Sequence, residues 1–433
     1  MTSICVDGFN LAIAKGSGIA TYGRNLVSAI NEMGIESGAL YGTQSPVSRD
    51  RLLDTIALTD AQIPRGKPDK LQRWARTVGT RFGRVARPVT PAPEIIWTDA
   101  GGGQPPVDKM WAAEKLYDYA IRGQRAYGNF TPLRFQGGHG PDAVHWTCPL
   151  PLHASGRTNL YTFHDLIPLK LPHSTAEDKP AYMAMCREVV RKADHLLAVS
   201  ETTRRDVIEL LGVSEDRITT TYQSVDLPPV VLEENEESSA NYIEGVFDLG
   251  WKDYFLYYGA IEPKKNVGRI VEAYLASGVK TPLIIVGGRS WLDKGEASII
   301  SSVVESENAR RRGRIRKYEF LSSDMLFRLI RGAKATLFPS LYEGFGLPVL
   351  ESMMLGTAVL TSTAGSLPEI AGGAATLVDP YDVEAITKAV VALDNDADLV
   401  GSLVSQGRER AKAFTAEKHR ERLHEVYSGQ GLI

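Results

Sequence analysis

Phe338-Pro-Ser-Leu-Tyr-Glu-Gly-Phe-Gly-Leu-Pro-Val-Leu-Glu351 has, in order, the features of a strand end, a tight turn and the start of a helix. The apolar run 333–338 predicts the strand. Gly344 and Gly346 let the backbone turn tightly and approach a ligand. Pro348 suits the first helical position, where its missing N–H costs nothing. The stretch therefore predicts a strand–turn–helix unit with its turn close to a ligand.

The start of this predicted helix has the properties of an anion site. The free N–H groups and the positive dipole end at Phe345, Gly346 and Leu347 attract negative charge. Glu343 precedes them, and Glu351 lies about one turn into the helix. A bound diphosphate would have one carboxylate near each of its substituents, as a nucleotide-sugar requires. The alternative is that the two acids only complement the helix dipole.

The same stretch resembles the signature of the family-4-type retaining glycosyltransferases. That signature has two glutamates separated by seven residues, as Glu343 and Glu351 are. The resemblance implies an α/β protein of the GT-B fold, with two Rossmann-like βαβ domains that face each other across a cleft. It further implies that Glu343 and the amides of 345–347 bind sugar and phosphate, and that Glu351 binds the ribose.

A second motif, Gly259-Ala-Ile-Glu-Pro-Lys-Lys-Asn-Val267, follows a predicted strand at 254–258. It resembles the family's Gly-x-x-Glu-Pro-Arg-Lys-Asn element, which implies that Lys265, with Lys264, binds the donor diphosphate. A positioned cation stabilises the charge that develops on the leaving nucleoside diphosphate. Ala260 stands where some relatives have an arginine. Two lysines on a solvated loop are the alternative.

The first half of the chain supplies three further candidates. A predicted strand at 159–163 ends at His164, at the carboxyl edge of a parallel sheet, where ligands bind. The resemblance implies that His164 contacts the donor sugar, whereas a lone histidine is more often structural. Gly16 and Gly18 lie too far past the first strand for a dinucleotide-binding loop. The resemblance implies that they lie near the donor phosphate and the acceptor.

Phe320 and Leu321 match the position at which relatives hold the nucleobase through main-chain groups. Recognition by the backbone leaves little trace of the base in the sequence. The base is therefore not predicted by these two residues.

Length and the order of predicted elements indicate two domains. A chain of 433 residues exceeds one ordinary core, and strands alternating with helices imply parallel βαβ units. Prolines followed by an acidic run at 227–239 mark a linker. We predict a first domain at 1–228, a donor domain at 229–415 and a helix at 416–433 that returns to the first domain.

Residues 45–135 form the least typical part of the first domain and are predicted to be an insertion. Between Arg65 and Arg87 there are eight basic residues and one acid, with apolar residues at spacings of three and four. This basic amphipathic pattern is typical of contact with an anionic membrane surface, although a solvated helix packed on the domain would share it. A second helical stretch is predicted at 108–127.

Charge and cysteine content exclude several classes. A net charge of −3 predicts no nucleic-acid partner, and the basic run 310–317 lacks interleaved aromatic residues. Cys5, Cys148 and Cys186 have no metal or disulfide spacing, which suits a reducing compartment. The first residues do not have the pattern of a signal peptide. We expect a cytoplasmic protein, peripheral on the inner face of the membrane if 65–87 binds there.

These motifs together predict a hexosyltransferase. His164-Asp-Leu-Ile-Pro168 with the Glu-Pro-Lys-Lys-Asn element is most similar to bacterial mannosyltransferases of polysaccharide and lipopolysaccharide assembly. The resemblance implies GDP-mannose as donor and a glycan or lipid-linked oligosaccharide as acceptor. No cofactor or metal is expected, and Asp394-Asn-Asp396 is interpreted as a connection between helices. Alternatives are another GDP- or UDP-sugar, a nucleotide-sugar epimerase, or a non-catalytic scaffold that binds sugar nucleotides.

Overall fold

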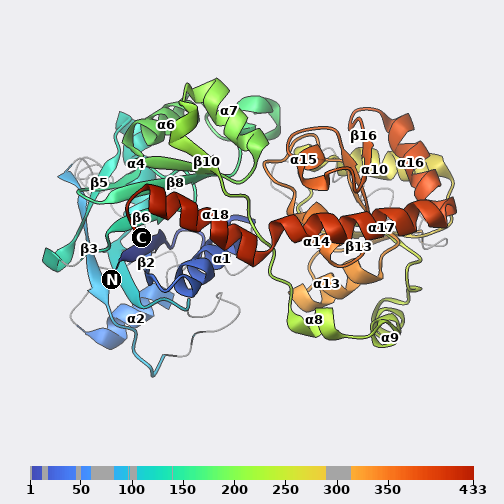
Figure 1. Cartoon of the computed structure of the whole chain (residues 1–433), viewed down its shortest axis with the longest axis horizontal. Helices are drawn as coiled ribbons and strands as arrows, with labels where there is room; N and C mark the ends of the chain where they lie inside the picture. Colours follow the sequence, from blue (N-terminus) through green and yellow to red (C-terminus); the bar gives the residue numbers. More distant parts are fainter. Residues whose placement is uncertain are drawn as a thin grey trace. The chain divides into compact units, whose positions relative to one another are not determined.

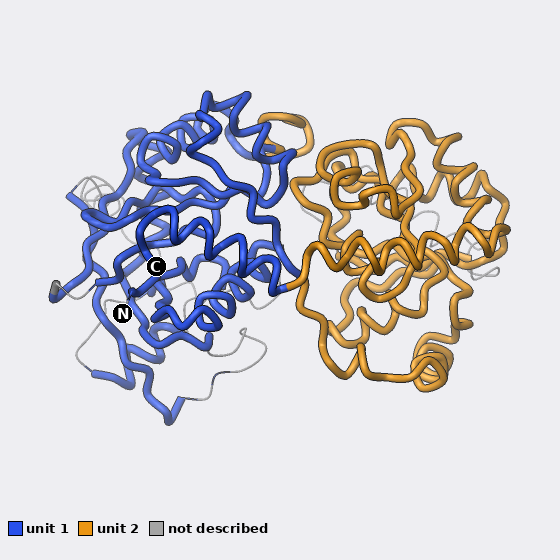
Figure 2. The backbone as a smooth tube through the Cα atoms, in the orientation of Figure 1, with its two compact units in different colours: residues 1–166, 177–224, 416–433 blue, residues 167–176, 225–415 orange. Residues whose placement is uncertain are grey.

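The computed structural model describes residues 2–11, 18–44, 50–59, 82–95, 97, 105–138, 140–288 and 314–433. The chain divides into two compact units (Figure 2). Unit 1 comprises 1–166, 177–224 and 416–433, and unit 2 comprises 167–176 and 225–415. The main division thus lies at 224–225, four positions before the predicted one. The segment 167–176, which belongs to unit 2, was predicted to be part of the first domain.

Unit 1 is built on a ten-stranded sheet (Figure 1), in the order β10-β9-β8-β6-β1-β2-β4-β3-β5-β7. Its strands are β1 (Ser3–Asp7), β2 (Glu36–Thr43), β3 (Arg84–Val89), β4 (Lys109–Glu114), β5 (Thr131–Phe135), β6 (Ala143–Trp146), β7 (Leu152–Ala154), β8 (Thr158–Phe163), β9 (His195–Ala198) and β10 (Ile218–Thr220). Only the β3–β4 pair is antiparallel among the described strands; the others pair in parallel.

The helices of unit 1 are α1 (Gly18–Glu32), α2 (Arg51–Thr59), α4 (Leu116–Tyr127), α6 (Lys179–Lys192), α7 (Glu201–Leu211) and α18 (Ala416–Gly429). The returning helix α18 packs against α1. It buries Leu423, Val426 and Tyr427 on one face, and the hydroxyl of Tyr427 lies 2.8 Å from Nδ1 of His145 on β6. The last helix is therefore part of the core of unit 1.

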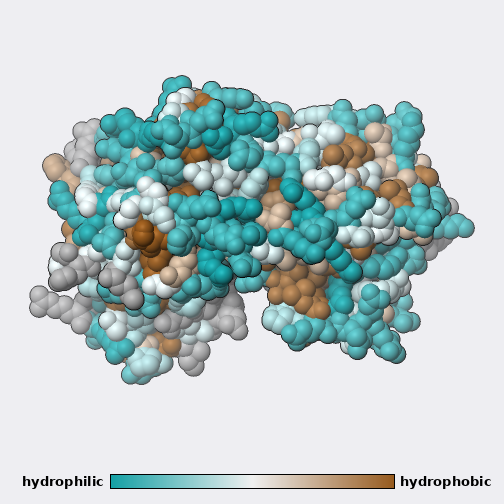
Figure 3. All heavy atoms as spheres, in the orientation of Figure 1, coloured by the Kyte–Doolittle hydropathy of each residue, from teal (hydrophilic) through white to brown (hydrophobic). Residues whose placement is uncertain are grey.

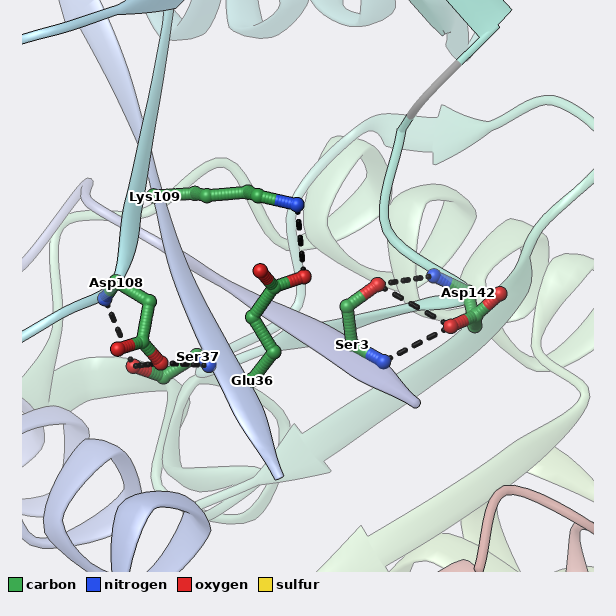
Figure 4. Close-up of polar contacts among 6 residues, drawn as sticks. All are labelled: Ser3, Glu36, Ser37, Asp108, Lys109 and Asp142. Atoms are coloured by element: carbon green, nitrogen blue, oxygen red, sulfur yellow. Dashed lines mark hydrogen bonds and ion pairs between the residues drawn. The ribbon is translucent and has the colours of Figure 1, made fainter. Parts of the chain in front are cut away.

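Polar side chains tie together the starts of the strands of unit 1 (Figure 4). Asp142, just before β6, accepts a hydrogen bond from the backbone N–H of Ser3 at 2.8 Å. Asp108, just before β4, accepts one from the backbone N–H of Ser37, also at 2.8 Å. Each carboxylate satisfies a backbone donor of the neighbouring strand, so the pairing of these strands is fixed at their first residues.

The predictions for 45–135 need correction. Where it is described, this region is no separate insertion, because β3, β4 and β5 are strands of the sheet. The helix predicted at 108–127 is wrong in its first part, since Lys109–Glu114 is β4 and the helix begins at Leu116. β4 is buried on both faces, so its apolar run carries no alternation that would distinguish it from a helix.

Of the basic amphipathic pattern, residues 65–81 lie outside the described residues. The remainder, from Arg84 to Arg87, belongs to strand β3 and not to a helix.

Unit 2 is built on a six-stranded sheet whose strands all pair in parallel, in the order β13-β12-β11-β14-β15-β16. The strands are β11 (Phe255–Tyr258), β12 (Leu283–Val286), β13 (Ile315–Tyr318), β14 (Ala335–Phe338), β15 (Ala358–Ser362) and β16 (Thr376–Val378). The helices are α5 (Ile167–Lys170), α8 (Pro229–Glu233), α9 (Glu236–Phe247), α10 (Val267–Ser277), α13 (Ser323–Gly332), α14 (Leu347–Met354), α15 (Leu367–Ala371), α16 (Val383–Asn395) and α17 (Ala397–Ala411). The predicted parallel βαβ organisation is confirmed.

The stretch 227–239, predicted as a linker, is largely helical. It forms α8 and the start of α9, whose N-cap Asn235 accepts a hydrogen bond from the N–H of Ser238. Val230 and Leu232 on α8 are about half exposed. Figure 3 shows a mostly hydrophilic face on which apolar side chains gather in small patches, one of them over α8 and α13. None of the described helices is both long and apolar enough to cross a bilayer.

Candidate functional site

The turn between β14 and α14 carries Glu343 to the carboxyl edge of the sheet of unit 2. The predicted strand–turn–helix is confirmed, with β14 ending at Phe338 and α14 beginning at Leu347. Gly346 has a φ of 111°, and a Cβ there would lie 2.8 Å from Cδ2 of Leu367. A side chain at 346 would therefore strain the backbone and displace Leu367, so the turn requires glycine.

A second loop, between β15 and α15, holds this turn in place. The hydroxyl of Ser366 lies 2.7 Å from the carbonyl oxygen of Phe345 and 3.0 Å from that of Glu343, and shares its proton between them. Gly365 has a φ of 59°, and a Cβ there would lie 2.6 Å from the carbonyl oxygen of Glu343. Neither Ser366 nor Gly365 was predicted from the sequence. The only indication of this loop in the sequence is that Gly365 follows a strand, β15, that ends at the same edge of the sheet.

Lys265 and Glu343 form an ion pair at this edge. Nζ of Lys265 lies 2.6 Å from Oε1 of Glu343, and the side chains are only 16% and 10% exposed. Burial opposes ionisation of Glu343, but Lys265 and Lys264 outweigh it and hold the pKa of this carboxyl below its ordinary value. The glutamate is therefore charged at neutral pH.

Asn266 fixes the turn that carries the two lysines. Its backbone is left-handed, with a φ of 63°, and its amide donates to the carbonyls of Pro339 at 2.9 Å and Pro380 at 2.7 Å. The carbonyl of Lys264 accepts from the N–H of Leu341 at 2.7 Å. Three loops of the sheet edge, after β11, β14 and β16, are thus joined through hydrogen bonds. Sequence reasoning gave Asn266 no role of its own.

Glu351 has different surroundings. Its Oε2 accepts a hydrogen bond from the hydroxyl of Tyr258 at 2.8 Å, and burial raises the pKa of this carboxyl to about 7. The two glutamates of one motif are therefore driven in opposite directions, one toward the charged form and the other toward the neutral form.

The remaining predicted residues of unit 2 lie at the same edge, because all six strands run in one direction. Phe320 and Leu321 follow the end of β13, and the side chain of Phe320 is 67% exposed. Gly287, after β12, lies so close to Gly259, after β11, that a Cβ on it would overlap the carbonyl oxygen of Gly259. The structure thus brings Lys264, Lys265, Phe320, Leu321, Glu343, Phe345, Gly346, Leu347 and Glu351 to one edge of one unit.

His164 lies at the end of β8 in unit 1. Its Nε2 donates to the carbonyl of Thr147 at 2.8 Å, and the ring of Tyr22 meets it edge-on with the ring centroids 4.9 Å apart. Burial lowers the pKa of His164, so the ring is neutral at pH 7. With the proton on Nε2, Nδ1 is left as an acceptor. The backbone of Thr147 is held in turn by the buried carboxylate of Asp7, which accepts from its N–H.

Gly18 begins α1 in unit 1, and Gly16 lies outside the described residues. Asp394 and Asp396 lie where α16 ends and α17 begins, as expected for a helix connection. Asp394 forms an ion pair with Lys334 at 2.9 Å, and Asp396 caps α17.

Two family models match this chain. Residues 248–410 match "Glycosyl transferases group 1", and residues 114–228 match "Glycosyltransferase Family 4". Together they cover well over half of the chain.

Curated relatives include the O-antigen chain mannosyltransferase B of Escherichia coli. It is 32% identical over 263 residues, which are 59% of this chain and 66% of the relative. The serotype-specific mannosyltransferase WbdA of Escherichia coli is 30% identical over 321 residues, which are 70% of this chain and 37% of the relative. The matches thus span slightly less than two thirds of one relative and about a third of the other.

Solved structures of similar fold include sucrose-phosphate synthase from Thermosynechococcus elongatus, with a TM-score of 0.66, 15% identity and 99% of both chains covered. WaaG, a glycosyltransferase involved in lipopolysaccharide biosynthesis, has a TM-score of 0.62 and 15% identity, with 99% of this chain and 100% of WaaG covered. At this identity the likeness establishes the architecture. The chain is a two-domain α/β protein of the GT-B fold and belongs to the group 1 and family 4 glycosyltransferases.

Proposed function

We propose that this protein is a retaining glycosyltransferase that moves mannose from GDP-mannose to a glycan or lipid-linked oligosaccharide in cell-surface polysaccharide synthesis. The observation that carries the proposal is the buried Lys265–Glu343 pair at the start of α14. It combines a cation, a carboxylate and free helix N–H groups at one sheet edge. The choice of mannose rests on relatives named as mannosyltransferases.

In this proposal the diphosphate binds to the N–H groups of 345–347 and to the lysines at 264 and 265. Glu343 accepts hydrogen bonds from the sugar, Glu351 from the ribose, and the main chain at 320–321 holds the base. His164 offers its unprotonated Nδ1 to a sugar hydroxyl. Gly16 and Gly18 lie near the phosphate and the acceptor.

The proposed reaction needs no side-chain nucleophile and no metal. The acceptor oxygen forms a bond to the anomeric carbon on the face from which the phosphate oxygen leaves. The acceptor proton passes to that phosphate oxygen, so GDP is released and the configuration is retained. Lys265 and the helix N-terminus stabilise the charge that develops on GDP.

We also propose peripheral contact with an anionic membrane through 65–87. In the described part of this segment, Phe82 is 81% exposed, Val85 is 52% exposed, and Arg87 is exposed. Exposed apolar and basic side chains together favour an anionic bilayer surface. Sedimentation with anionic liposomes should recover the protein at low salt and lose it at high salt. Replacement of the arginines of 65–87 by glutamine should abolish binding, and equal recovery of this variant would contradict the contact.

The donor is tested with a panel of GDP-, UDP-, dTDP- and ADP-sugars without added metal. Thermal stabilisation and release of nucleoside diphosphate should both be greatest with GDP-mannose. A stronger response to another sugar nucleotide would refute the donor and keep the enzyme class. Conversion of the donor without any acceptor product would support an epimerase, and no response to any donor would support a scaffold.

A further inference from the structure

Tyr258, the last residue of β11, connects that strand to the first turn of α14. Its hydroxyl lies 2.8 Å from Oε2 of Glu351 and 2.9 Å from the carbonyl oxygen of Pro348. The tyrosine is 4% exposed. Within the described residues, Oε1 of Glu351 accepts no hydrogen bond. One oxygen of the carboxyl is therefore held, and the other is available.

These contacts allow two complete hydrogen-bond patterns that differ by one proton. A hydroxyl carries one proton, so Tyr258 donates to only one of its two acceptors at a time. The carbonyl of Pro348 has a second donor, the hydroxyl of Ser352 at 2.7 Å. Tyr258 can therefore donate to an ionised Glu351 without leaving Pro348 unpaired. When Glu351 is protonated, it can itself donate to the Tyr258 oxygen, and Tyr258 then donates to Pro348.

We propose that Tyr258 is a positioning residue for nucleotide binding: its hydroxyl holds one oxygen of the ionised Glu351 carboxylate and leaves the other for the ribose hydroxyls. This inference rests on the proposed function, in which Glu351 binds the ribose. A carboxylate fixed before the ligand arrives loses less conformational freedom on binding, so the contact contributes more affinity.

The surroundings of Glu351 give this role a pH dependence. Burial raises the pKa of Glu351, the Tyr258 hydrogen bond lowers it, and no lysine or arginine of the described residues contributes. Lys264 and Lys265 act on Glu343 instead. Recognition of the ribose hydroxyls should therefore improve as pH rises through about 7. Loss of the Tyr258 hydroxyl should move this midpoint to higher pH, because the ionised carboxylate loses its donor.

The test compares GDP with 2′,3′-dideoxy-GDP by calorimetry on the full chain, from about pH 6 to about pH 9. The ratio of the two affinities isolates the ribose contact from titration of the phosphates. Above neutral pH the wild type should prefer GDP about tenfold, and Tyr258→Phe should reduce this preference to about twofold. Tyr254→Phe is the matched control. It removes a buried hydroxyl that donates to the carbonyl of Leu329 at 2.5 Å, and it should keep the wild-type preference.

An unchanged preference and midpoint in folded Tyr258→Phe would overturn the positioning role alone. If that variant fails to fold, Glu351→Gln decides, since its amide oxygen keeps the bond from Tyr258 but cannot titrate. The pH dependence of the preference should then vanish, and its persistence would overturn the inference. A wild type that binds both nucleotides equally would instead refute the ribose role of Glu351 in the proposed function, and one that binds neither would refute GDP-mannose as the donor.

Discussion

At the scale of single residues, the partners of Glu343 and Glu351 decide which of the two carboxyls is charged at neutral pH. Glu343 has a lysine 2.6 Å away, whereas among the described residues the side chain of Glu351 has only the neutral Tyr258 hydroxyl as a partner. Burial opposes ionisation of both carboxyls, and the cation reverses the outcome at one of them. The same residue type thus provides a permanent anion beside the lysines and a titrating group a turn further on.

Lys265→Ala should lower the rate of transfer by about 10²- to 10³-fold, because the leaving diphosphate loses a positioned cation. It should also lower the free energy of unfolding by about 3 kcal/mol at pH 8, because Glu343 remains buried without its closest partner. The pairing depresses the pKa of Glu343, so its stabilisation is present above the ordinary value of 4.5 and disappears as pH falls. Denaturant unfolding at pH 8 and pH 4 measures the difference.

The matched control is Lys388→Ala, since Lys388 pairs with Glu384 on an exposed helix face where both side chains are about three quarters exposed. That variant should have the free energy of unfolding and the rate of transfer of the wild type. Equal turnover by Lys265→Ala would refute the site assignment.

Asp7 gives a second pH prediction. Burial raises the pKa of this carboxyl from 3.8 to about 6. A raised carboxyl pKa favours the fold most below the ordinary value, and this contribution is lost as pH rises through the folded value. From pH 4 to pH 7 the wild type should lose about 2 kcal/mol of stability through this group. In Asp7→Asn that loss should be absent, so the two pH profiles of unfolding should diverge over this range. Parallel profiles would contradict the assignment to Asp7.

At the scale of elements, the turn from β14 to α14 requires a backbone conformation with positive φ at Gly346. Gly346→Ala should abolish nucleotide binding, because the left-handed φ and the contact with Leu367 leave no room for a Cβ. Gly245→Ala, in exposed α9 with no atom within 4 Å of its added Cβ, should instead stabilise the protein by about 1 kcal/mol. Calorimetric GDP binding and thermal unfolding of both variants test the contrast, and normal binding by Gly346→Ala would contradict it.

The elements also show where sequence reasoning succeeds. The β14–α14 unit was predictable because its signals are local: an apolar run, two glycines and a proline. β4 was not, because a strand buried on both faces lacks alternation. Ser366, Asn266 and Tyr258 were missed because each acts on residues 21 to 114 positions away in the chain. A serine, asparagine or tyrosine alone carries no sign of such a partner.

At the scale of the whole molecule, the predicted donor residues divide between two units with separate cores. The groups proposed for the base and the ribose, and the lysines and amides proposed for the diphosphate, belong to unit 2, whereas His164 and Gly18 belong to unit 1. Nucleotide and sugar are therefore expected to protect different segments of the backbone from hydrogen exchange.

Hydrogen exchange of the full chain, measured with GDP and with GDP-mannose, should show this difference in protection. GDP alone should protect the backbone at 259–266 and 341–347 and leave 162–166 unchanged. GDP-mannose should protect all three segments, since the proposed function assigns the contact with His164 to the sugar. Protection of 162–166 by GDP alone would contradict the proposed role of His164. Lys388→Ala serves again as the control and should show the wild-type pattern.

The division of unit 1 into three stretches of chain has a consequence for the order of events during synthesis. Its sheet is made early, but α18, which supplies the hydrogen-bond partner of Nδ1 of buried His145, is made only after the whole of 225–415. Translation at about 5–20 residues per second separates these steps by roughly 10–40 s. Unit 2 can therefore fold on the ribosome while unit 1 still exposes the surface that α18 will cover, and this unfinished surface is where a chaperone would bind the nascent chain.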